Sequence, residues 1–533
     1  MFPNVNNNEG FLNDKDRENL KKINIELAKT TLEALYNDNF NIYKAFTTSE
    51  EKLYLTYLSA DSEGASQKPS TLLLKIKKIF PKLKEESDIV QRPQIIANKA
   101  VTFDELLLNI RDYKDGQEID EIWFEIYNIF EKDEEWKNKL ENLIKALDFT
   151  NMPDKISQEN VQKLYGNTLK TSVSRLEKYK SCPFSFYLKY GLKIEEKDSY
   201  KIESIDTGSF MHDVIDTFFE RIQDLGLSVS IIEVKEVKKI LDEIIDEKLN
   251  LPKNYIFSSS PKFKNQTAKL KRLIYKAMEY IIRTITDSDF EVFGHELEFG
   301  DNKKYPPITI ELEDGKKVEI RGKIDRVDIA KDESGKYLRI IDYKSQIKDL
   351  DLNSVAYGLQ LQLLTYLDAI IKEEDAKPAG VLYFSLIEPV INSDKKRTKE
   401  ELENEIRKSF KMKGLVLADV KVVKMMDKNL ENGYSEMLPV YIGKDDEISQ
   451  KSSSVATKEQ FIALQKYITK LIKDISKEIL SGNIEIKPYY KDKKTPCDYC
   501  EYKGICQFDK NKLGNEYSYV PSFSKDEIWN EFK

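Results

Sequence analysis

Apolar positions in the first third of the chain recur mainly at helical spacing. Residues 14–47 and 103–148 carry this pattern, and a possible cap at Asn13 or Asp14 opens the first segment. Ser70 precedes apolar residues at helical intervals up to Pro81, which predicts a further helix. Between these segments the stretch LYLTYL (53–58) alternates and predicts a strand. This part of the chain is therefore expected to be mostly helical.

After residue 172 the pattern becomes mixed. The turn sequence ESGK separates two of the alternating segments, which indicates a hairpin. Helices are expected over 208–225, 230–285 (two helices), 353–373, 397–410 and 455–481, and strands over 290–299, 316–330, 336–345 and 380–386. Residues 411–454 give no clear pattern, and no internal repeat is found. The order helix, three strands, helix, strand predicts a mixed α/β (α+β) fold with a central sheet flanked by helices.

The strand at 336–345 ends in two opposite charges. Asp342 and Lys344 lie on one face because side chains alternate along a strand, and Tyr343 points to the other face. If ESGK closes a hairpin, Asp325 on the preceding strand can meet Asp342. Two neighbouring carboxylates repel unless a cation lies between them, and oxygen ligands favour Mg²⁺ or Mn²⁺. This pattern predicts phosphodiester hydrolysis with Lys344 beside the scissile phosphate, while a simple ion pair at a strand end is the structural alternative.

Length and charge limit the possible classes of protein. A chain of 533 residues is too long for one core and predicts two to four domains. No run of 18 apolar residues occurs, and MFPNVNNNEG does not resemble a signal peptide, so a cytoplasmic location is expected. Because the net charge is -8, any nucleic-acid site must be a local basic patch.

Two basic segments are candidates for contact with DNA. Residues 175–193 interleave basic and aromatic side chains, and residues 262–283 are rich in lysine and arginine. The structural alternatives are that the aromatic residues of the first segment pack in the interior and that the second is a solvated helix face.

The four cysteines are unevenly spaced. Cys497, Cys500 and Cys506 form C-x2-C-x5-C, and Cys182 stands 315 residues before the first of them. In a cytoplasmic protein, clustered cysteines are more often metal or cluster ligands than disulfides. One inorganic centre would therefore join the two ends of one domain, and spacing alone leaves zinc and an iron-sulfur cluster both open.

The sequence G-K-I-D followed by D-Y-K resembles the active site of PD-(D/E)XK nucleases, and GSFMHDVID (208–216) resembles the histidine helix of the RecB-type members. This resemblance implies a restriction-endonuclease-like core. It also implies metal ligands at His212, Asp325, Asp342 and Tyr343, with Lys344 as a catalytic residue. In that family a Q-x-x-x-Y motif, here Gln362 and Tyr366, faces the substrate strand. On the residues alone, a structural role is favoured for His212, Gln362 and Tyr366.

The cysteine pattern resembles the iron-sulfur site of AddB/RexB-type subunits of bacterial helicase-nucleases. This resemblance implies a 4Fe-4S cluster on Cys182, Cys497, Cys500 and Cys506. It extends over most of the chain, which is similar to the C-terminal portion of such a subunit, although no G-x-x-x-x-G-K-[ST] motif for ATP occurs. The expected domains are a helicase-like remnant at 1–150, the nuclease domain at 168–510 and a tail at 511–533.

The function expected from these features is a Mg²⁺-dependent DNA exonuclease acting in repair of double-strand breaks by homologous recombination. The implied partners are DNA, as a single strand or a duplex end, and an AddA/RexA-type subunit in a heterodimer. The alternative is a non-catalytic DNA-binding or scaffold subunit stabilised by the iron-sulfur cluster. A zinc protein with an unrelated hydrolase site is the weakest hypothesis, because zinc-protease and P-loop signatures are absent from the sequence.

Overall fold

The computed structural model describes residues 12–25, 27–60, 66–85, 96–147, 150–195, 201–387, 398–512 and 514–533. The sequence MFPNVNNNEG, which was predicted not to be a signal peptide, lies outside the described residues. Contacts divide the chain into two units, Met1–Leu147 and Asp148–Lys533, and each is described by itself. No helix in the described part of the chain is long and apolar enough to span a bilayer.

The first unit is helical. Its elements are α1 (Asp14–Lys21), α2 (Thr31–Thr47), α3 (Thr71–Ile79), α4 (Lys99–Lys114), α5 (Ile122–Lys132) and α6 (Glu134–Leu147). Helices α4 to α6 enclose a small core built on Phe103, Trp123 and Phe130. Side-chain caps start several of these helices: Asn13 begins α1 with a capping box, and Ser70 accepts a hydrogen bond from the backbone of α3.

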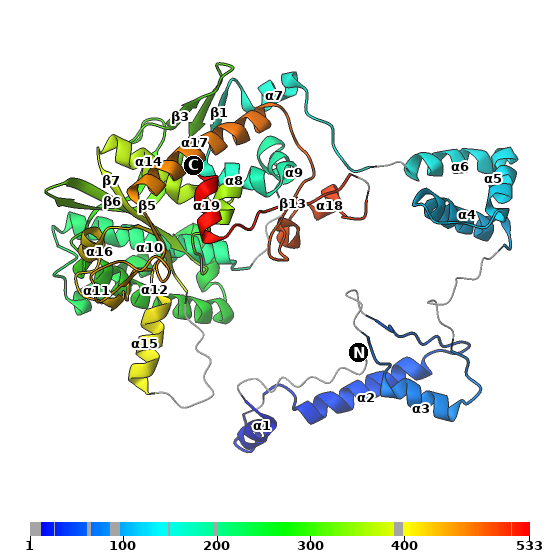
Figure 1. The fold of residues 1–533 in the computed structure, drawn as a ribbon. Helices are drawn as coiled ribbons and strands as arrows, with labels where there is room; N and C mark the ends of the chain where they lie inside the picture. The colour runs from blue at the N-terminus through cyan, green and yellow to red at the C-terminus, as the bar shows by residue number, and fades with distance from the viewer. Residues whose placement is uncertain are drawn as a thin grey trace. The chain divides into compact units, whose positions relative to one another are not determined.

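The second unit contains the main sheet, which is mixed (Figure 1). The strand order is β11-β8-β7-β6-β5-β2; β6 runs parallel to β7 and β11 to β8, and the other neighbours are antiparallel. These strands are β2 (Glu291–Phe299), β5 (Gly322–Asp332), β6 (Gly335–Lys344), β7 (Lys377–Ser385), β8 (Lys413–Leu417) and β11 (Val455–Ala456). A small sheet of order β1-β4-β3 comprises β1 (Thr168–Thr171), β4 (Lys317–Ile320) and β3 (Ile308–Glu311). Two short pairs are formed by β9 (Gly433–Tyr434) with β10 (Tyr441–Ile442) and by β12 (Tyr489–Tyr490) with β13 (Ser518–Tyr519).

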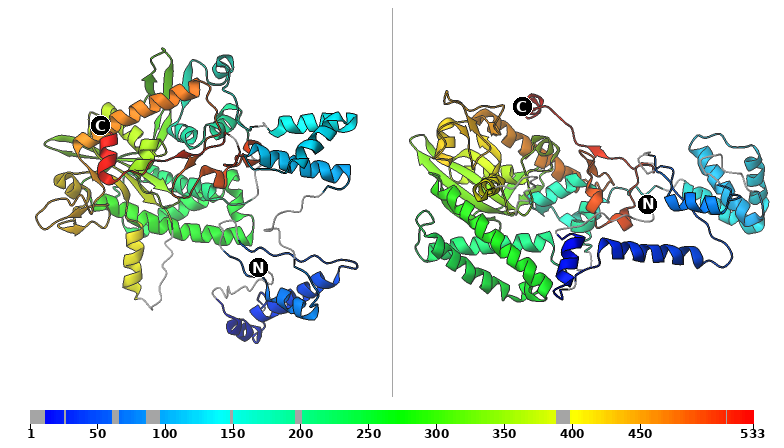
Figure 2. Two further views of the ribbon diagram at one scale, coloured as in Figure 1. Left: turned by 45° about the vertical axis from the view of Figure 1, so that its right-hand side comes forward. Right: turned by 90° about the horizontal axis from the view of Figure 1, so that it is seen from below.

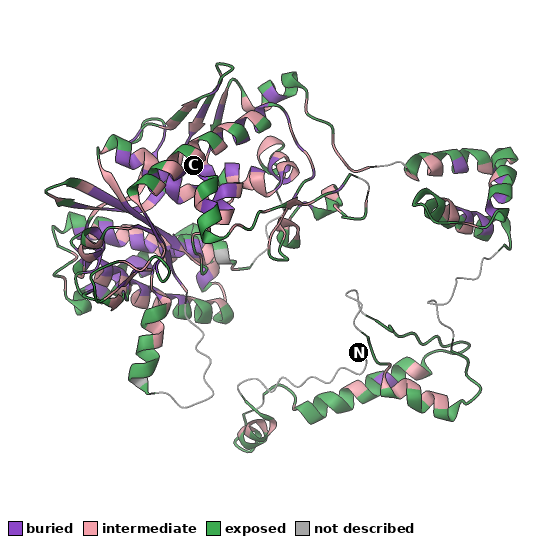
Figure 3. Cartoon of the chain, in the orientation of Figure 1, coloured by how far each residue is buried: buried purple, intermediate pink, exposed green. Residues whose placement is uncertain are grey.

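Helices cover both faces of the main sheet (Figures 1 and 2). On one face lie α8 (Val173–Ser181), α14 (Gln362–Glu373) and α17 (Lys458–Leu480), and on the other α10 (Ser204–Asp224), α11 (Val234–Leu249) and α12 (Pro261–Thr286). The remaining helices are α7 (Gln158–Tyr165), α9 (Pro183–Phe186), the π-helical turn Tyr187–Gly191, the 3₁₀ turns Pro252–Ser258 and Pro496–Tyr499, α13 (Leu352–Tyr357), α15 (Lys399–Ser409), α16 (Val420–Met426), α18 (Lys503–Cys506) and α19 (Lys525–Glu531). Figure 3 shows that the buried residues concentrate between the sheet and these two helical layers. The mixed α/β fold class is therefore confirmed.

Several expected elements are divided or absent. The strand expected at 53–58 is wrong: the segment is exposed and has no strand partner in the described region, and an unpaired strand is unstable in water. The segment 316–330 divides at Arg321 into β4 and β5, which belong to different sheets. The expected helix over 353–373 breaks at Gly358, whose φ of 102° is left-handed and ends α13.

Shorter deviations occur elsewhere along the chain. The segment 14–47 forms two helices, because Thr30 and Glu33 start a new helix with a capping box. Residues 455–481 begin as β11 before Thr457 caps α17. The segment without a clear pattern, 411–454, contains the short elements β8, α16, β9 and β10.

Candidate active site

Three acidic residues occupy neighbouring positions on three adjacent strands. In the hairpin of β5 and β6, Arg326 pairs with Ile341, and this register continues to Asp325 opposite Asp342. On the other side of β5, the pairs Leu297 with Ile324 and His295 with Arg326 bring Glu296 opposite Asp325. The row Glu296, Asp325, Asp342 therefore lies across β2, β5 and β6 on the sheet face covered by α14.

Asp325 lies in a strongly perturbing environment. Its carboxylate accepts a hydrogen bond from the Tyr343 backbone N–H at 2.8 Å. Burial, together with the neighbouring charge of Asp342, raises the pKa of Asp325 from its usual 3.8 to about 7. The two carboxylates thus destabilise each other when both are ionised, and a bound cation would remove that repulsion.

His212 reaches the same point from α10, on the opposite side of the sheet from α14. One ring nitrogen, Nε2, lies 2.9 Å from the Tyr343 carbonyl oxygen, and Nδ1 lies 3.5 Å from Asp325 Oδ2. Burial lowers the pKa of His212. When neutral, the ring donates Nε2–H to the carbonyl and keeps the Nδ1 lone pair directed toward Asp325.

Histidine, cysteine, aspartate and glutamate side chains can bind metal ions. In the described part of the chain, the one group of three or more such side chains whose ligand atoms are close enough to share an ion is His212, Glu296 and Asp325. Their ligand atoms all lie within 4.8 Å of one another. Glu296 was not a candidate in the sequence analysis. Its backbone is left-handed, with φ of 48°, and its carboxylate is paired with the ammonium of Lys323. Counting the register from Asp325 across β5 to β2 would identify it, but only once the pairing of these strands is known.

Asp342 is almost fully buried and has two polar neighbours. The Lys344 ammonium lies 2.5 Å from Asp342 Oδ2, and the Gln362 side-chain amide donates to Asp342 Oδ1 at 3.3 Å. Gln362 begins α14, where the backbone N–H groups of Leu361 and Gln362 donate to Glu177 at 2.6 and 3.1 Å. Glu177, also missed from the sequence, thus fixes the helix end that carries Gln362.

Tyr366 lies one turn after Gln362 and is buried beside the row. Burial raises the pKa of its phenol, with smaller contributions from Glu177, Asp342 and Asp325. Its ring stacks on Phe299 at 6.0 Å between centroids. The phenol therefore lies near the carboxylates, but it also forms part of the core.

Tyr343 contributes to the site through its backbone. Its side chain is buried on the opposite face, where Arg326 and Arg339 both pair with Asp328. Its N–H and carbonyl contact Asp325 and His212, respectively. Of the ligands implied by the resemblance, Tyr343 therefore presents its carbonyl oxygen and not its hydroxyl to the site.

The four cysteines converge although Cys182 is remote in sequence. Cys182, Cys497, Cys500 and Cys506 line one small cavity together with Phe184 and Tyr502, and none forms a disulfide. Burial raises the pKa of Cys182 to about 11, so a thiolate there requires a compensating positive charge. Four thiols are the donor set of a zinc or an iron-sulfur centre, although no three of these sulfur atoms lie within 4.8 Å of one another in the described part of the chain. Phe184 packs at this cavity, and Arg175 lies over the Tyr190 ring at 4.8 Å, so part of the basic-aromatic segment has a structural role.

Comparison with known proteins agrees with this geometry. Residues 170–507 match the family model of the PD-(D/E)XK nuclease superfamily, and the chain belongs to that superfamily. Residues 90–146, which include α4, α5 and all but the last residue of α6, match the fifth domain of the ATP-dependent helicase/deoxyribonuclease AddB.

Curated relatives support the same assignment. The chain is 40% identical to the B-type subunit of the ATP-dependent helicase/deoxyribonuclease of Clostridium tetani, over 99% of its length and 46% of the relative. It is 41% identical to the corresponding protein of Clostridium novyi, over 99% of its length and 47% of the relative. The chain thus spans about half the length of these relatives, and the expected AddB-type resemblance is confirmed.

Proposed function

We propose that the chain acts as a Mg²⁺-dependent exodeoxyribonuclease within an AddAB-type helicase-nuclease that functions in double-strand break repair in the cytoplasm. The observation that carries this proposal is the row of Glu296, Asp325 and Asp342, with His212 and Lys344 beside it. The deoxyribonuclease named in the relatives suggests DNA as substrate. The same names suggest a second subunit of AddA type as partner.

The donor set fits a hard divalent cation, because it combines carboxylate oxygens, one imidazole nitrogen and a backbone carbonyl oxygen. His212, Glu296, Asp325, Asp342 and the Tyr343 carbonyl would hold the ion. When bound, Mg²⁺ supplies Lewis-acid stabilisation of charge on the phosphate.

The protein's own side chains then have distinct tasks. The Lys344 ammonium is positioned beside Asp342 to stabilise negative charge that develops on the phosphate oxygens. Gln362 orients Asp342 by donating to its carboxylate. Glu177 holds the helix end on which Gln362 stands, so the carboxylate row is supported from the α14 side.

The four cysteines would hold a 4Fe-4S cluster, which the AddB-type resemblance favours over zinc. The cavity unites α9, the segment at 486–488 and the C-terminal cysteines, so the cluster would join distant parts of the second unit. Anaerobically purified protein should contain about four iron atoms and absorb broadly in the visible range. Zinc in place of iron would refute this assignment.

The decisive experiment for the nuclease is cleavage of end-labelled single-stranded DNA with and without Mg²⁺. Wild-type protein should degrade the strand only with Mg²⁺, and Asp342→Asn should lose this activity by about 10²-fold or more while retaining its iron spectrum. Asp301→Asn, an exposed carboxylate paired with Arg321, is the matched control and should cleave normally. Salt-dependent DNA binding without Mg²⁺-dependent cleavage by wild-type protein would instead identify a non-catalytic DNA-binding protein.

A further inference from the structure

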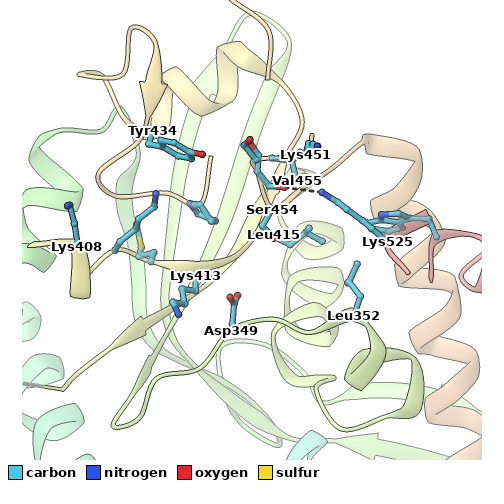
Figure 4. Close-up of a pocket in the computed structure, with 16 residues that line it drawn as sticks. Asp349, Leu352, Lys408, Lys413, Leu415, Tyr434, Lys451, Ser454, Val455 and Lys525 are labelled. Carbon is cyan, nitrogen blue, oxygen red and sulfur yellow. Dashed lines mark hydrogen bonds between the residues drawn. The ribbon is translucent and has the colours of Figure 1, made fainter. Parts of the chain in front are cut away.

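A cavity lined by several lysines lies in the nuclease unit (Figure 4), and no residue of the carboxylate row lines it. Its volume is about 470 Å³, and its walls come from α15, β8, the segment before β11, α13 and α19. Asp349 is the single carboxylate among the described residues that line it. Five lysines line it: Lys408, Lys411, Lys413, Lys451 and Lys525.

Most of this charge is not neutralised by the protein. In the described part of the chain, no carboxylate forms an ion pair with Lys411, Lys413 or Lys451, whereas Lys408 lies 3.8 Å from Glu405. Lys525 donates to the backbone carbonyls of Gln450 and Ser453 instead of to an acid. Burial lowers the pKa of Lys411, which is half-buried. Like charges gathered in one cavity repel, so an anion placed there would relieve the repulsion.

The cavity also has an exposed aromatic wall. Tyr434 is 66% exposed, and its ring meets Tyr441 edge-on at 4.7 Å between centroids. The Lys411 ammonium lies 5.6 Å from the centre of the Tyr434 ring. The combination of an exposed ring with several free cations is the pattern that accepts a stacked base and its phosphate.

The register of the sheet connects this cavity to the carboxylate row. Asp342 on β6 pairs with Tyr383 on β7, and Tyr383 pairs with Lys413 on β8. Directly paired residues share a sheet face, so Lys413 lies on the same face as Asp342 and two strands away. Two strand spacings are about 10 Å, which is about three nucleotides at the ~3.4 Å rise of a duplex strand.

Tyr383 and Lys348 lie between the carboxylate row and the lysine cavity. Tyr383 pairs with Asp342 on one side and with Lys413 on the other, and its side chain is buried between the two sites. The Lys348 ammonium stands 4.9 Å from the centre of the Tyr383 ring and adds positive charge along the path. The carboxylate row and the cavity therefore lie on one face of the sheet, two strands apart, with Tyr383 buried between them.

We propose that this lysine cavity binds the phosphate backbone of single-stranded DNA a few nucleotides from the scissile bond, with a base stacked on Tyr434. This inference rests on the proposed nuclease function, since it assigns the strand that occupies the carboxylate row. Single-stranded DNA suits the cavity better than a small free anion, because the cations are distributed around the walls and an exposed ring accompanies them.

Binding of a labelled oligothymidylate, measured by fluorescence anisotropy in EDTA over a range of salt concentrations, tests the inference without catalysis. Lys413→Gln with Lys451→Gln should weaken binding and reduce the slope of log K against log[salt] by about 1.4, which corresponds to two lost phosphate contacts at about 0.7 each. The matched control replaces Lys421 and Lys424, which are paired with Asp332 and Asp446 outside the cavity, and should keep the wild-type slope. Equal slopes for the cavity variant and the control variant would overturn the proposal.

Tyr434 offers an independent test of stacking. Tyr434→Ala should weaken oligonucleotide binding at least about fivefold, and Tyr434→Phe, which keeps the aromatic face, should restore it. Equal affinity of the alanine and phenylalanine variants would remove the stacked base from the proposal.

Cleavage kinetics separate the failure of this inference from the failure of the nuclease assignment. The cavity variants should raise KM for a long oligonucleotide but leave unchanged the hydrolysis of a small phosphodiester, such as a nitrophenyl ester of thymidine monophosphate, which reaches only the carboxylate row. An equal loss of cleavage activity on the oligonucleotide and on the small phosphodiester would overturn the proposal that the cavity binds DNA. If wild-type protein cleaved neither substrate while oligonucleotide binding still depended on Lys413 and Lys451, the nuclease function would fail and the binding site would stand.

Discussion

The replacement Asp325→Asn removes one charge from the carboxylate row without changing the size of the side chain. The asparagine oxygen can still accept the hydrogen bond from the Tyr343 N–H. What the substitution removes is the free-energy cost of keeping a buried carboxylate beside Asp342. We therefore expect the variant to be more stable than wild type in the absence of divalent cations, although it loses activity.

The magnitude follows from the pKa of Asp325, which burial and Asp342 raise from 3.8 to about 7. At pH values between 3.8 and about 7 the folded state binds more protons than the unfolded chain, so the free energy of unfolding falls as the pH rises through this range. With about 1.36 kcal/mol per pKa unit, the destabilisation is about 2 kcal/mol at pH 5 and about 4 kcal/mol at pH 8. The advantage of Asp325→Asn should thus grow by roughly 2–3 kcal/mol between these pH values.

Urea denaturation followed by circular dichroism, under anaerobic conditions in EDTA, measures this difference at both pH values. Asp301→Asn is the control, since this exposed carboxylate pairs with Arg321 at the surface. Adding Mg²⁺ at pH 8 should stabilise wild type and the control but not Asp325→Asn, because a ligand stabilises only the form that binds it. A variant no more stable than wild type at pH 8, with the same pH dependence, would refute the argument that the row is electrostatically strained.

Three further predictions concern neighbouring features. Glu296→Gln should reduce Mg²⁺ affinity, measured calorimetrically, by at least about tenfold, because it replaces a charged carboxylate ligand with a neutral amide; unchanged affinity would exclude Glu296 from the site. Gly322→Ala should destabilise the second unit by about 1–3 kcal/mol in urea denaturation, because the added methyl group collides with the Tyr366 phenol. The control Gly504→Ala adds its methyl group to open space and should leave the free energy of unfolding unchanged. Cys500→Ser should abolish the visible absorption and increase protease sensitivity of the C-terminal segment, and retained iron would contradict four-cysteine ligation.

The alternation of side chains in strands made the centre of the site predictable. The ESGK turn indicated the hairpin, so Asp325 and Asp342 could be placed opposite each other by counting alone. Local periodicity therefore predicted a contact between consecutive strands. Gln362 was a candidate only through the resemblance of Q-x-x-x-Y to the family motif, and its contact with Asp342 arises because α14 packs on β6 and β7.

Glu296 could not be predicted in the same way. The strand β2 is separated from β5 by the small sheet strands β3 and β4, and a bulge between Val292 and Gly294 shifts its register. Glu177 lies 184 residues before Leu361, and only the tertiary packing of α8 against α14 brings it to the helix end. Both residues depend on long-range pairing that no local pattern records.

The most direct test of the carboxylate row as a metal centre is a crystal structure of the protein soaked with Mn²⁺, with the metal located by anomalous scattering. We expect a peak among His212, Glu296, Asp325 and Asp342, with the Tyr343 carbonyl oxygen in its coordination shell. A manganese peak elsewhere in the nuclease unit, or none at this row in protein that cleaves DNA, would contradict the assignment.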